Sequence, residues 1–215
     1  MADRGRPRSF DRDTALRAAM QTFWKLGYEG ASMAELTRAM GINSPSLYAC
    51  FGSKEGLFLE AARLYLDIEN GDTKNTLFGE PNARDGIRAL LQHSARSLSR
   101  PDFPHGCMLI LGDTNSSARN DNIRRYLAEW RREAQAGFEQ RLRRGIEDGD
   151  VPAQADVKGI AAFYMTVLQG LSLRARDGAS RQALLQVVNA AMSAWDALAT
   201  QKAEKRSRPA IGTSG

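Results

Sequence analysis

The sequence predicts an all-α fold in which a small N-terminal domain of three helices precedes a larger helical domain. From Ser53 onward, apolar residues recur at steps of three and four, which is the spacing of one helix face. Alternation of β-branched and polar residues, which would indicate strands, is almost absent. A hydrophobic content of 42% in 215 residues is enough for a packed core.

A short helix is expected to begin after Ser32, because Glu35 follows three residues later. In such a capping box the hydroxyl and the carboxylate each accept a hydrogen bond from a backbone N–H near the helix start. Leu36 and Met40 share one face. Gly41 can adopt the left-handed conformation that ends a helix, so this helix is expected to be about two turns long.

A second short helix is expected to begin between Asn43 and Pro45, because asparagine and serine cap helices and proline is tolerated in the first turn. Leu47 and Phe51 face inward. The outer positions are small or polar, which suits close approach to base edges in a major groove: Asn43, Ser44, Ser46, Tyr48 and Ala49. Two short helices joined at a glycine predict a helix-turn-helix. The alternative is a helical hairpin with a solvated polar face.

The candidate DNA contacts fall into three groups. Tyr48 and Lys54 offer a phenol and a cation for phosphates, with Ser53 capping the next helix beside them. A basic arm precedes the first helix and suits a minor groove, although it is also compatible with a solubilising tail: Arg4, Arg6 and Arg8. The candidates for contacts to bases are side chains of the two short helices: Asn43, Ser44, Ser46, Met33 and Thr37. Ser32, which caps the first of these helices, is a further candidate DNA contact.

Several motifs occur in a fixed order between residues 6 and 58. A helix ends in the pair Gly27-Tyr28, a capping residue precedes the helix-turn-helix, and Leu47-Tyr48 is followed by the run Phe-x-Ser-Lys-Glu-x-Leu at residues 51–57. This stretch, about the first quarter of the chain, resembles the DNA-binding domain of the TetR/AcrR family of transcriptional repressors. Ala49 and Cys50 stand where relatives often carry bulky or hydrogen-bonding residues, so the operator sequence cannot be carried over.

The chain divides into residues 1–52, the DNA-binding domain with its arm, residues 53–200, a helical effector-binding and dimerisation domain, and a basic tail at 201–215 that is expected to be disordered. Turn and capping signals in the second part predict helices that begin and end as follows: 53 to about 70–72, 82 or 85 to 100, 107–111, 120–148, 155–176 and 180–200. No strand is expected in this part.

The last two helices are apolar on more than one face, which exceeds what packing on one core requires. Two such helices from each of two subunits would form a four-helix interface, as the family resemblance also implies. A palindromic operator would follow, because two recognition helices about 34 Å apart suit successive major grooves. The alternative is that both faces are buried within one subunit. The candidate interface residues are Val167, Leu171, Leu184, Val188, Met192 and Trp195.

The family resemblance implies a small-molecule pocket among the central helices. Aromatic and flexible side chains there are candidates to line it, although core packing is the alternative for each: Phe103, Cys107, Met108, Tyr126, Trp130, Phe163, Tyr164 and Met165. Cys107 opens an apolar run after Pro104-His105-Gly106, and a thiol at a helix amino terminus favours the thiolate. It is therefore a candidate sensor of electrophiles or oxidants, or else an inert buried cysteine.

Other function classes find little support. Two cysteines suggest neither a disulfide framework nor a zinc site, His93 and His105 are not spaced as a ligand pair, and no phosphate loop or nucleophile elbow occurs. We expect no enzymatic activity, no metal and no cofactor. With no apolar run near the ~20 residues that span a bilayer and no signal peptide, a cytoplasmic protein without membrane contact is expected. The two basic termini account for the net charge of +5.

The sequence therefore predicts a homodimeric repressor released from double-stranded operator DNA by an unidentified small molecule or by modification of Cys107. The helix beginning after Ser53 would belong to both domains and transmit the effector's signal, for which a coupling of about 1–3 kcal/mol suffices. Two alternatives stay open at this point. One is a DNA-binding regulator with no effector and a collapsed core, and the other is a helical ligand-binding protein or enzyme with a vestigial DNA-binding domain.

Overall fold

The computed structural model describes residues 10–112 and 120–200, apart from the side chains of residues 69–72. Within these ranges it contains helices and no strand, as expected. The basic arm with Arg4, Arg6 and Arg8, and the tail at 201–215, lie outside the described residues. The helices are α1 (Arg12–Gly30), α2 (Met33–Met40), α3 (Ser44–Phe51), α4 (Lys54–Gly79), α5 (Ala83–Ser97), α6 (Met108–Leu111), α7 (Asp121–Asp148), α8 (Val157–Arg176), α9 (Arg181–Ser193) and α10 (Trp195–Thr200).

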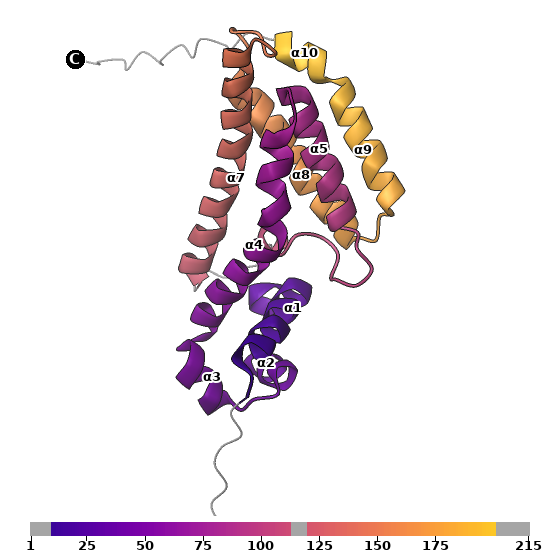
Figure 1. The fold of residues 1–215 in the computed structure, drawn as a ribbon. Helices are drawn as coiled ribbons and strands as arrows, with labels where there is room; N and C mark the ends of the chain where they lie inside the picture. Colours follow the sequence, from indigo (N-terminus) through magenta and orange to yellow (C-terminus); the bar gives the residue numbers. More distant parts are fainter. Residues whose placement is uncertain (1–9, 113–119, 201–215) are drawn as a thin grey trace, which may run out of the picture.

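The helices form an elongated molecule with a small unit at one end (Figure 1). α1, α2 and α3 make up this unit, and α4 runs from it into a larger bundle that contains α5, α7, α8 and α9. α4 packs against α1 at one end and against α5 and α7 at the other. One helix is therefore part of both regions.

The small unit is held together by an aromatic cluster and by its helix caps. The Phe23 and Phe58 rings meet edge to face at a centroid distance of 5.1 Å, and Tyr28 packs against both. The capping box at Ser32 is formed, and the carboxylate of Glu35 accepts the Ser32 N–H at 2.9 Å. The local signals in the sequence thus set the start of α2 as predicted.

α4 is longer than the sequence predicted. We expected it to end at or soon after Asn70-Gly71-Asp72, but it continues to Gly79. Leu77 near its end is 5% exposed and belongs to the core of the bundle. A glycine inside a helix costs about 1 kcal/mol, and burial of one leucine side chain offsets that cost. Packing therefore overrides the turn signal.

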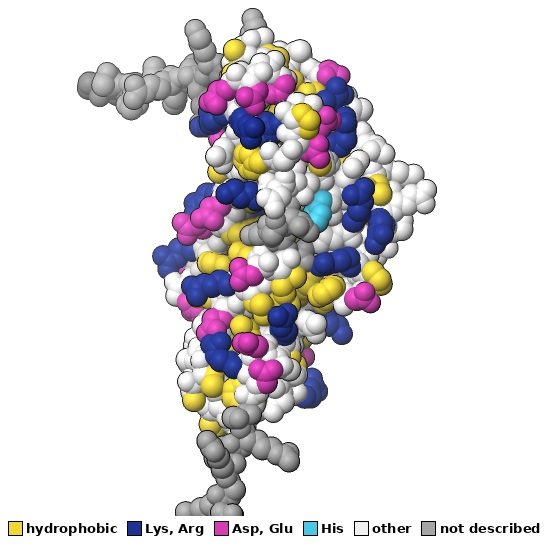
Figure 2. Space-filling view, viewed as in Figure 1, with side chains coloured by type: hydrophobic (Ala, Val, Ile, Leu, Met, Phe, Trp, Pro, Cys, Tyr) yellow, Lys and Arg dark blue, Asp and Glu magenta, His cyan; other side chains and the backbone are white. Residues whose placement is uncertain are grey.

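The C-terminal helical segment also differs from expectation, because Ala194 separates α9 from α10. Trp195 then opens α10 and is 4% exposed. α7 agrees closely with its predicted range and carries i,i+3 and i,i+4 ion pairs on its outer face. In Figure 2 basic and acidic side chains alternate over the face shown. No helix within the described ranges is long and apolar enough to cross a membrane.

Candidate DNA interface and effector pocket

The outer face of the helix-turn-helix consists of small and polar side chains around one exposed aromatic. Tyr48 is 51% exposed, and its neighbours Ser44, Ala49 and Cys50 are exposed as well. Leu47, on the opposite side of α3, is fully buried. The helix is therefore anchored through one face and presents the other to solvent, as a recognition helix requires.

Three of the candidate contact residues use their side chains as helix caps. The oxygens of Ser32, Asn43 and Ser53 accept backbone N–H groups at the starts of α2, α3 and α4, at 3.2, 2.9 and 2.9 Å. Each cap leaves its residue exposed at the surface. These side chains therefore fix where the helices begin, and a helix start is also a favourable place for a phosphate.

The two candidates within α2, Met33 and Thr37, are only partly exposed. The Thr37 hydroxyl donates to the Met33 carbonyl at 2.9 Å, and the Met33 side chain packs partly against the core. Of the candidates for contacts to bases, Ser44 is exposed and Ser46 is half-buried on α3. α3 therefore presents more of the candidate side chains to solvent than α2 does.

Lys54 and Arg12 hold α3 and α4 in position. The Lys54 ammonium lies 4.6 Å from the centroid of the Tyr28 ring, and partial burial lowers the pKa of Lys54, opposed by the nearby Glu29 and Glu35. The Arg12 guanidinium lies 4.6 Å from the centroid of the Phe51 ring. Arg12 also forms an ion pair of 2.6 Å with Glu60.

Sequence reasoning missed Arg12, because an arginine in the first turn of a helix carries no signal of its partners. Its two contacts join α1 to the end of α3 and to α4. Cation–π contacts at exposed sites contribute about 0.5–1 kcal/mol, and surface ion pairs about as much. Arg12 is therefore an added constraint on the recognition helix.

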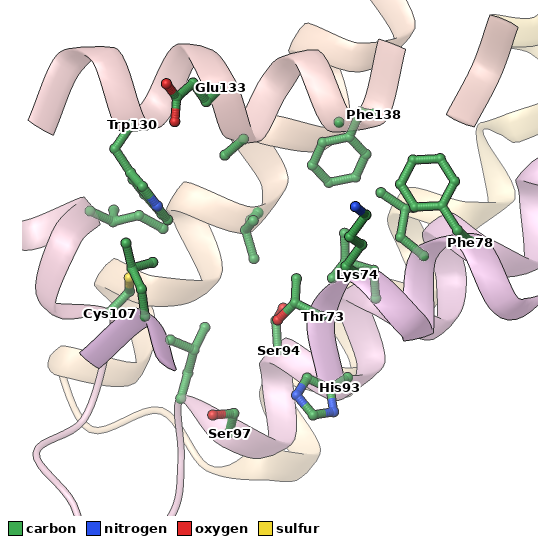
Figure 3. Close-up of a pocket in the computed structure, with 18 of the residues that line it drawn as sticks. Thr73, Lys74, Phe78, His93, Ser94, Ser97, Cys107, Trp130, Glu133 and Phe138 are labelled. Carbon is green, nitrogen blue, oxygen red and sulfur yellow. The ribbon is translucent and has the colours of Figure 1, made fainter. Parts of the chain in front are cut away.

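A pocket of about 460 Å³ lies between α4, α5, α6, α7 and α8 (Figure 3). Its walls are mainly apolar, with a smaller set of polar groups that includes Lys74, His93 and Glu133. The lining residues are Tyr65, Leu66, Thr73, Lys74, Leu77, Phe78, Leu90, His93, Ser94, Ser97, Leu98, Cys107, Ile110, Trp130, Glu133, Ala134, Gly137, Phe138, Gln140 and Leu168. Size and composition are typical of a small-molecule site.

Of the eight side chains predicted to line a pocket, Cys107 and Trp130 do so, and in Figure 3 both lie on the same side of the cavity. The four lining residues at 73–78 were missed because α4 was expected to end earlier. The other predicted residues do not line this pocket: Phe103, Met108, Tyr126, Phe163, Tyr164 and Met165.

Packing explains why those six side chains lie outside this pocket. Phe103 packs on Trp24 of α1, at a centroid distance of 5.6 Å. Tyr164 is fully buried between Phe163 and Trp195. Met108 and Met165 are core residues, and Tyr126 packs against the core from its edge. Aromatic and flexible side chains fill cores as readily as they line pockets.

The predicted interface residues need a similar correction. Leu171, Leu184, Val188, Met192 and Trp195 are each at most 4% exposed within the single chain, so they are core residues with no surface for a partner. Val167 is partly exposed. The accessible apolar and small residues of α8 and α9 include Phe163, Val167, Gly170, Leu173, Val187 and Ala190.

The described residues offer neither a metal-binding cluster nor a disulfide. Within residues 10–112 and 120–200 no group of three or more His, Cys, Asp or Glu side chains could hold a metal ion. Cys50 is exposed on α3 and Cys107 is buried beside the pocket, and they do not form a disulfide with each other. The two thiols thus sit in different regions of the molecule.

The fold and these two sites define a helix-turn-helix DNA-binding regulator with a helical ligand-binding region. Residues 15–61 match the family model for bacterial regulatory proteins of the tetR family, and residues 83–191 match that for a tetracyclin repressor-like C-terminal domain. The chain belongs to the TetR family of transcriptional regulators, and it is a regulator rather than an enzyme.

Individual relatives agree with this assignment. The chain is 35% identical to the HTH-type transcriptional repressor ComR of Escherichia coli (strain K12), over 91% of this chain and 93% of ComR. It is 32% identical to the repressor BdcR of the same organism, over 84% and 86%. A solved structure of the TetR family regulator CifR, a cysteine mutant complexed with 26-bp double-strand operator DNA, has 47% identity and a TM-score of 0.85, over 88% of this chain and 100% of that one.

Proposed function

We propose that this chain is a homodimeric repressor that leaves a palindromic operator when a small molecule occupies the pocket beside α4. The observation that carries the proposal is the double role of α4. Residues 65–78 of α4 supply six lining residues of the pocket. The first residue of α4, Lys54, comes three positions after Phe51, the last residue of the recognition helix α3. A shift of α4 at the pocket therefore moves α3.

The proposed dimer surface is the accessible face of α8 and α9. Leu173 on α8 is 52% exposed, which is high for a leucine, and Phe163 and Val167 lie along the same helix. Gly170 between them has open space where a Cβ would point. A glycine in mid-helix with nothing against it suits the close approach of a second helix.

The oligomeric state can be tested with two matched substitutions of exposed leucines. We expect Leu173→Arg to sediment as a monomer, because a buried unpaired charge in the interface is costly. Leu26→Arg on α1, where the leucine is 39% exposed, serves as the control and should remain a dimer. A Leu173→Arg variant that stays dimeric places the interface elsewhere.

Operator binding can be tested by selecting bound sequences from a random duplex library at a stated salt concentration. We expect a palindromic consensus. Tyr48→Ala should weaken binding to it more than Tyr48→Phe does, because Tyr48→Phe removes only the phenol hydroxyl. CifR, at 47% identity, is complexed with operator DNA in its solved structures. Absence of enrichment with a folded protein would refute the repressor proposal.

The effector is proposed to be a largely apolar molecule, because most of the pocket wall is apolar. The open cavity counts against a regulator without an effector, for which a collapsed core is expected. A thermal-shift screen of small apolar compounds should find molecules that raise the melting temperature and also reduce operator affinity. Ala134→Trp, which places a large ring in the cavity, should abolish that shift.

Cys107 is the proposed attachment point for an electrophilic effector, since it lines the pocket. N-ethylmaleimide is a suitable probe: the sulfur bonds to one alkene carbon, the π bond breaks and the thiol proton ends on the other carbon. In a Cys50→Ser background, alkylation should lower operator affinity, and Cys107→Ser should remove the effect. Unchanged affinity after complete alkylation would exclude the thiol from signalling.

A further inference from the structure

The helical geometry of α1 is broken at Gly27, and the break changes the hydrogen-bond partners of the neighbouring backbone groups. Gly27 has φ 72° and ψ 174°, a left-handed φ that favours glycine. In an unbroken helix the Tyr28 N–H would donate to the Trp24 carbonyl four residues earlier. Here it donates instead to the carbonyl of Gly112, beyond the end of α6, at 3.2 Å. The Trp24 carbonyl thereby loses its helical partner.

Arg176, in the last turn of α8, occupies the position that the break opens. Its Nη2 donates to the Trp24 carbonyl at 3.0 Å, and its Nε donates to the His105 carbonyl at 2.9 Å. One guanidinium therefore joins α1 of the DNA-binding region, α8 and the segment before α6. The break replaces one bond within α1 by two bonds to the ligand-binding region.

The side chain of Trp24 adds a third connection. Its indole N–H donates to the Gly106 carbonyl at 2.7 Å in a buried site. Gly106 has φ 82°, and a Cβ there would lie 2.7 Å from Leu111 Cδ1 and 2.8 Å from the Ser172 carbonyl oxygen, so the backbone approach requires glycine. The next residue is Cys107, whose N–H donates to the Ser172 hydroxyl at 2.8 Å.

The segment from His105 to Gly112 therefore has two roles. Cys107 and Ile110 line the pocket. The carbonyls of His105, Gly106 and Gly112 hold α1, directly or through Arg176. A displacement of this segment by a molecule in the pocket acts on α1 through these hydrogen bonds, in addition to the contact between the Trp24 ring and Tyr65 of α4 at a centroid distance of 4.8 Å.

We propose that the junction of Trp24, Gly27, Gly106 and Arg176 is a second route by which the pocket controls the DNA-binding region, with Arg176 as its positioning residue. Hydrogen bonds to a charged donor are stronger than neutral ones. At this junction the indole bond of Trp24 is buried and the two bonds of Arg176 are partly buried, which strengthens them relative to bonds in water. α4 already packs against α1. The junction fixes α1 as well, so the two routes together set the orientation of the recognition helix. The effect on operator binding rests on the proposed function, whereas the mechanical coupling does not.

The coupling can be measured without operator or natural effector by hydrogen exchange with mass spectrometry. All proteins carry Cys50→Ser, and N-ethylmaleimide is the probe at Cys107. We expect alkylation to raise amide exchange in residues 12–51 by about three-fold or more, while α9 stays protected. In Arg176→Met we expect exchange in residues 12–51 to be raised before alkylation and to respond little to it.

Matched variants separate coupling from general loss of structure. Arg174→Met removes an exposed arginine from the same turn of α8 and should behave as the parent. Trp24→Phe keeps the ring and removes the indole donor, so it should weaken the response even if Arg176→Met does not fold. An undiminished response in Arg176→Met or Trp24→Phe would overturn the proposal. Equal loosening of α9 on alkylation would overturn it too, and neither result depends on whether the protein binds DNA.

Discussion

The Lys54 ammonium lies 4.6 Å from the centroid of the Tyr28 ring. Tyr28 is the residue after the break in α1, and Lys54 is the first residue of α4. The pair thus joins the two helices that connect the DNA-binding region to the rest of the molecule. It also holds a partly buried cation beside the recognition helix.

We expect Lys54→Met to weaken operator binding without changing sequence preference. A lysine that neutralises one phosphate contributes about one unit to the slope of log K against log salt, so that slope should fall by about 1. Lys25→Met, with the same charge change on an exposed site of α1, is the control and should keep the slope. Equal slopes for both variants would remove Lys54 from the interface.

Asn43→Ala should destabilise the recognition helix. The Asn43 side chain accepts the Ser46 N–H at 2.9 Å, and loss of such a cap costs about 1 kcal/mol. We expect a lower urea midpoint together with weaker operator binding. Asn43→Asp should retain the cap in unfolding experiments but bind DNA less well, because it adds a negative charge near phosphates. If Asn43→Ala unfolds like the parent, the cap is dispensable.

The helix-turn-helix could be predicted because its signals are local. The capping box at Ser32, the left-handed Gly41 and the cap at Asn43 each lie within four residues of the bond they form, and all are present. The same reasoning ended α4 too early, because Leu77 stabilises its last turn through distant contacts. A local turn signal carries no information on such contacts.

The pocket and the interdomain junction were harder to predict for the same reason. Arg176 forms hydrogen bonds with His105 and Trp24, which are 71 and 152 positions away in the sequence. Contacts over such separations produce no periodic pattern in the sequence. The dimer candidates were chosen by hydrophobicity, which selects buried residues such as Val188 ahead of the exposed glycine and leucine of α8. Only the Gly27-Tyr28 pair, noted as a family motif, hinted at the junction.

Arg141 should respond differently to removal of its charge and removal of its volume. It is fully buried, its Nη2 donates to the Glu80 carbonyl at 3.2 Å, and its Nε and Nη1 have no hydrogen-bond partner among the described residues. Arg141→Met fills most of the same space, so we expect a free energy of unfolding within about 1 kcal/mol of the parent or above it. Arg141→Ala leaves a cavity and should cost about 2–4 kcal/mol.

Urea unfolding at one fixed protomer concentration is the appropriate measurement, since dimer stability depends on concentration. Arg144→Met, on the exposed side of the same helix, should change little. If Arg141→Met proves as unstable as Arg141→Ala, the charge itself is stabilising. The guanidinium would then act through the carbonyl end of α4, whose dipole favours a cation.

Tyr164 should make stability fall in alkaline solution. Burial raises the pKa of Tyr164 to about 12 from an ordinary value of 10.0, with Arg84 and Arg88 opposing the shift. The pKa of Tyr164 is higher in the folded chain than in the unfolded one. The contribution of the buried, protonated phenol to the free energy of unfolding is therefore complete below pH 10 and is lost as the pH rises toward 12. The loss is on the order of 2 kcal/mol.

Tyr164→Phe removes the titrating group and a single hydrogen bond of 3.4 Å to the Ala191 carbonyl, so it should cost less than about 1 kcal/mol at pH 7. Between pH 9 and pH 11 its urea midpoint should fall less than that of the parent. Parallel curves for the parent and Tyr164→Phe would mean that water reaches the phenol between α8 and α9.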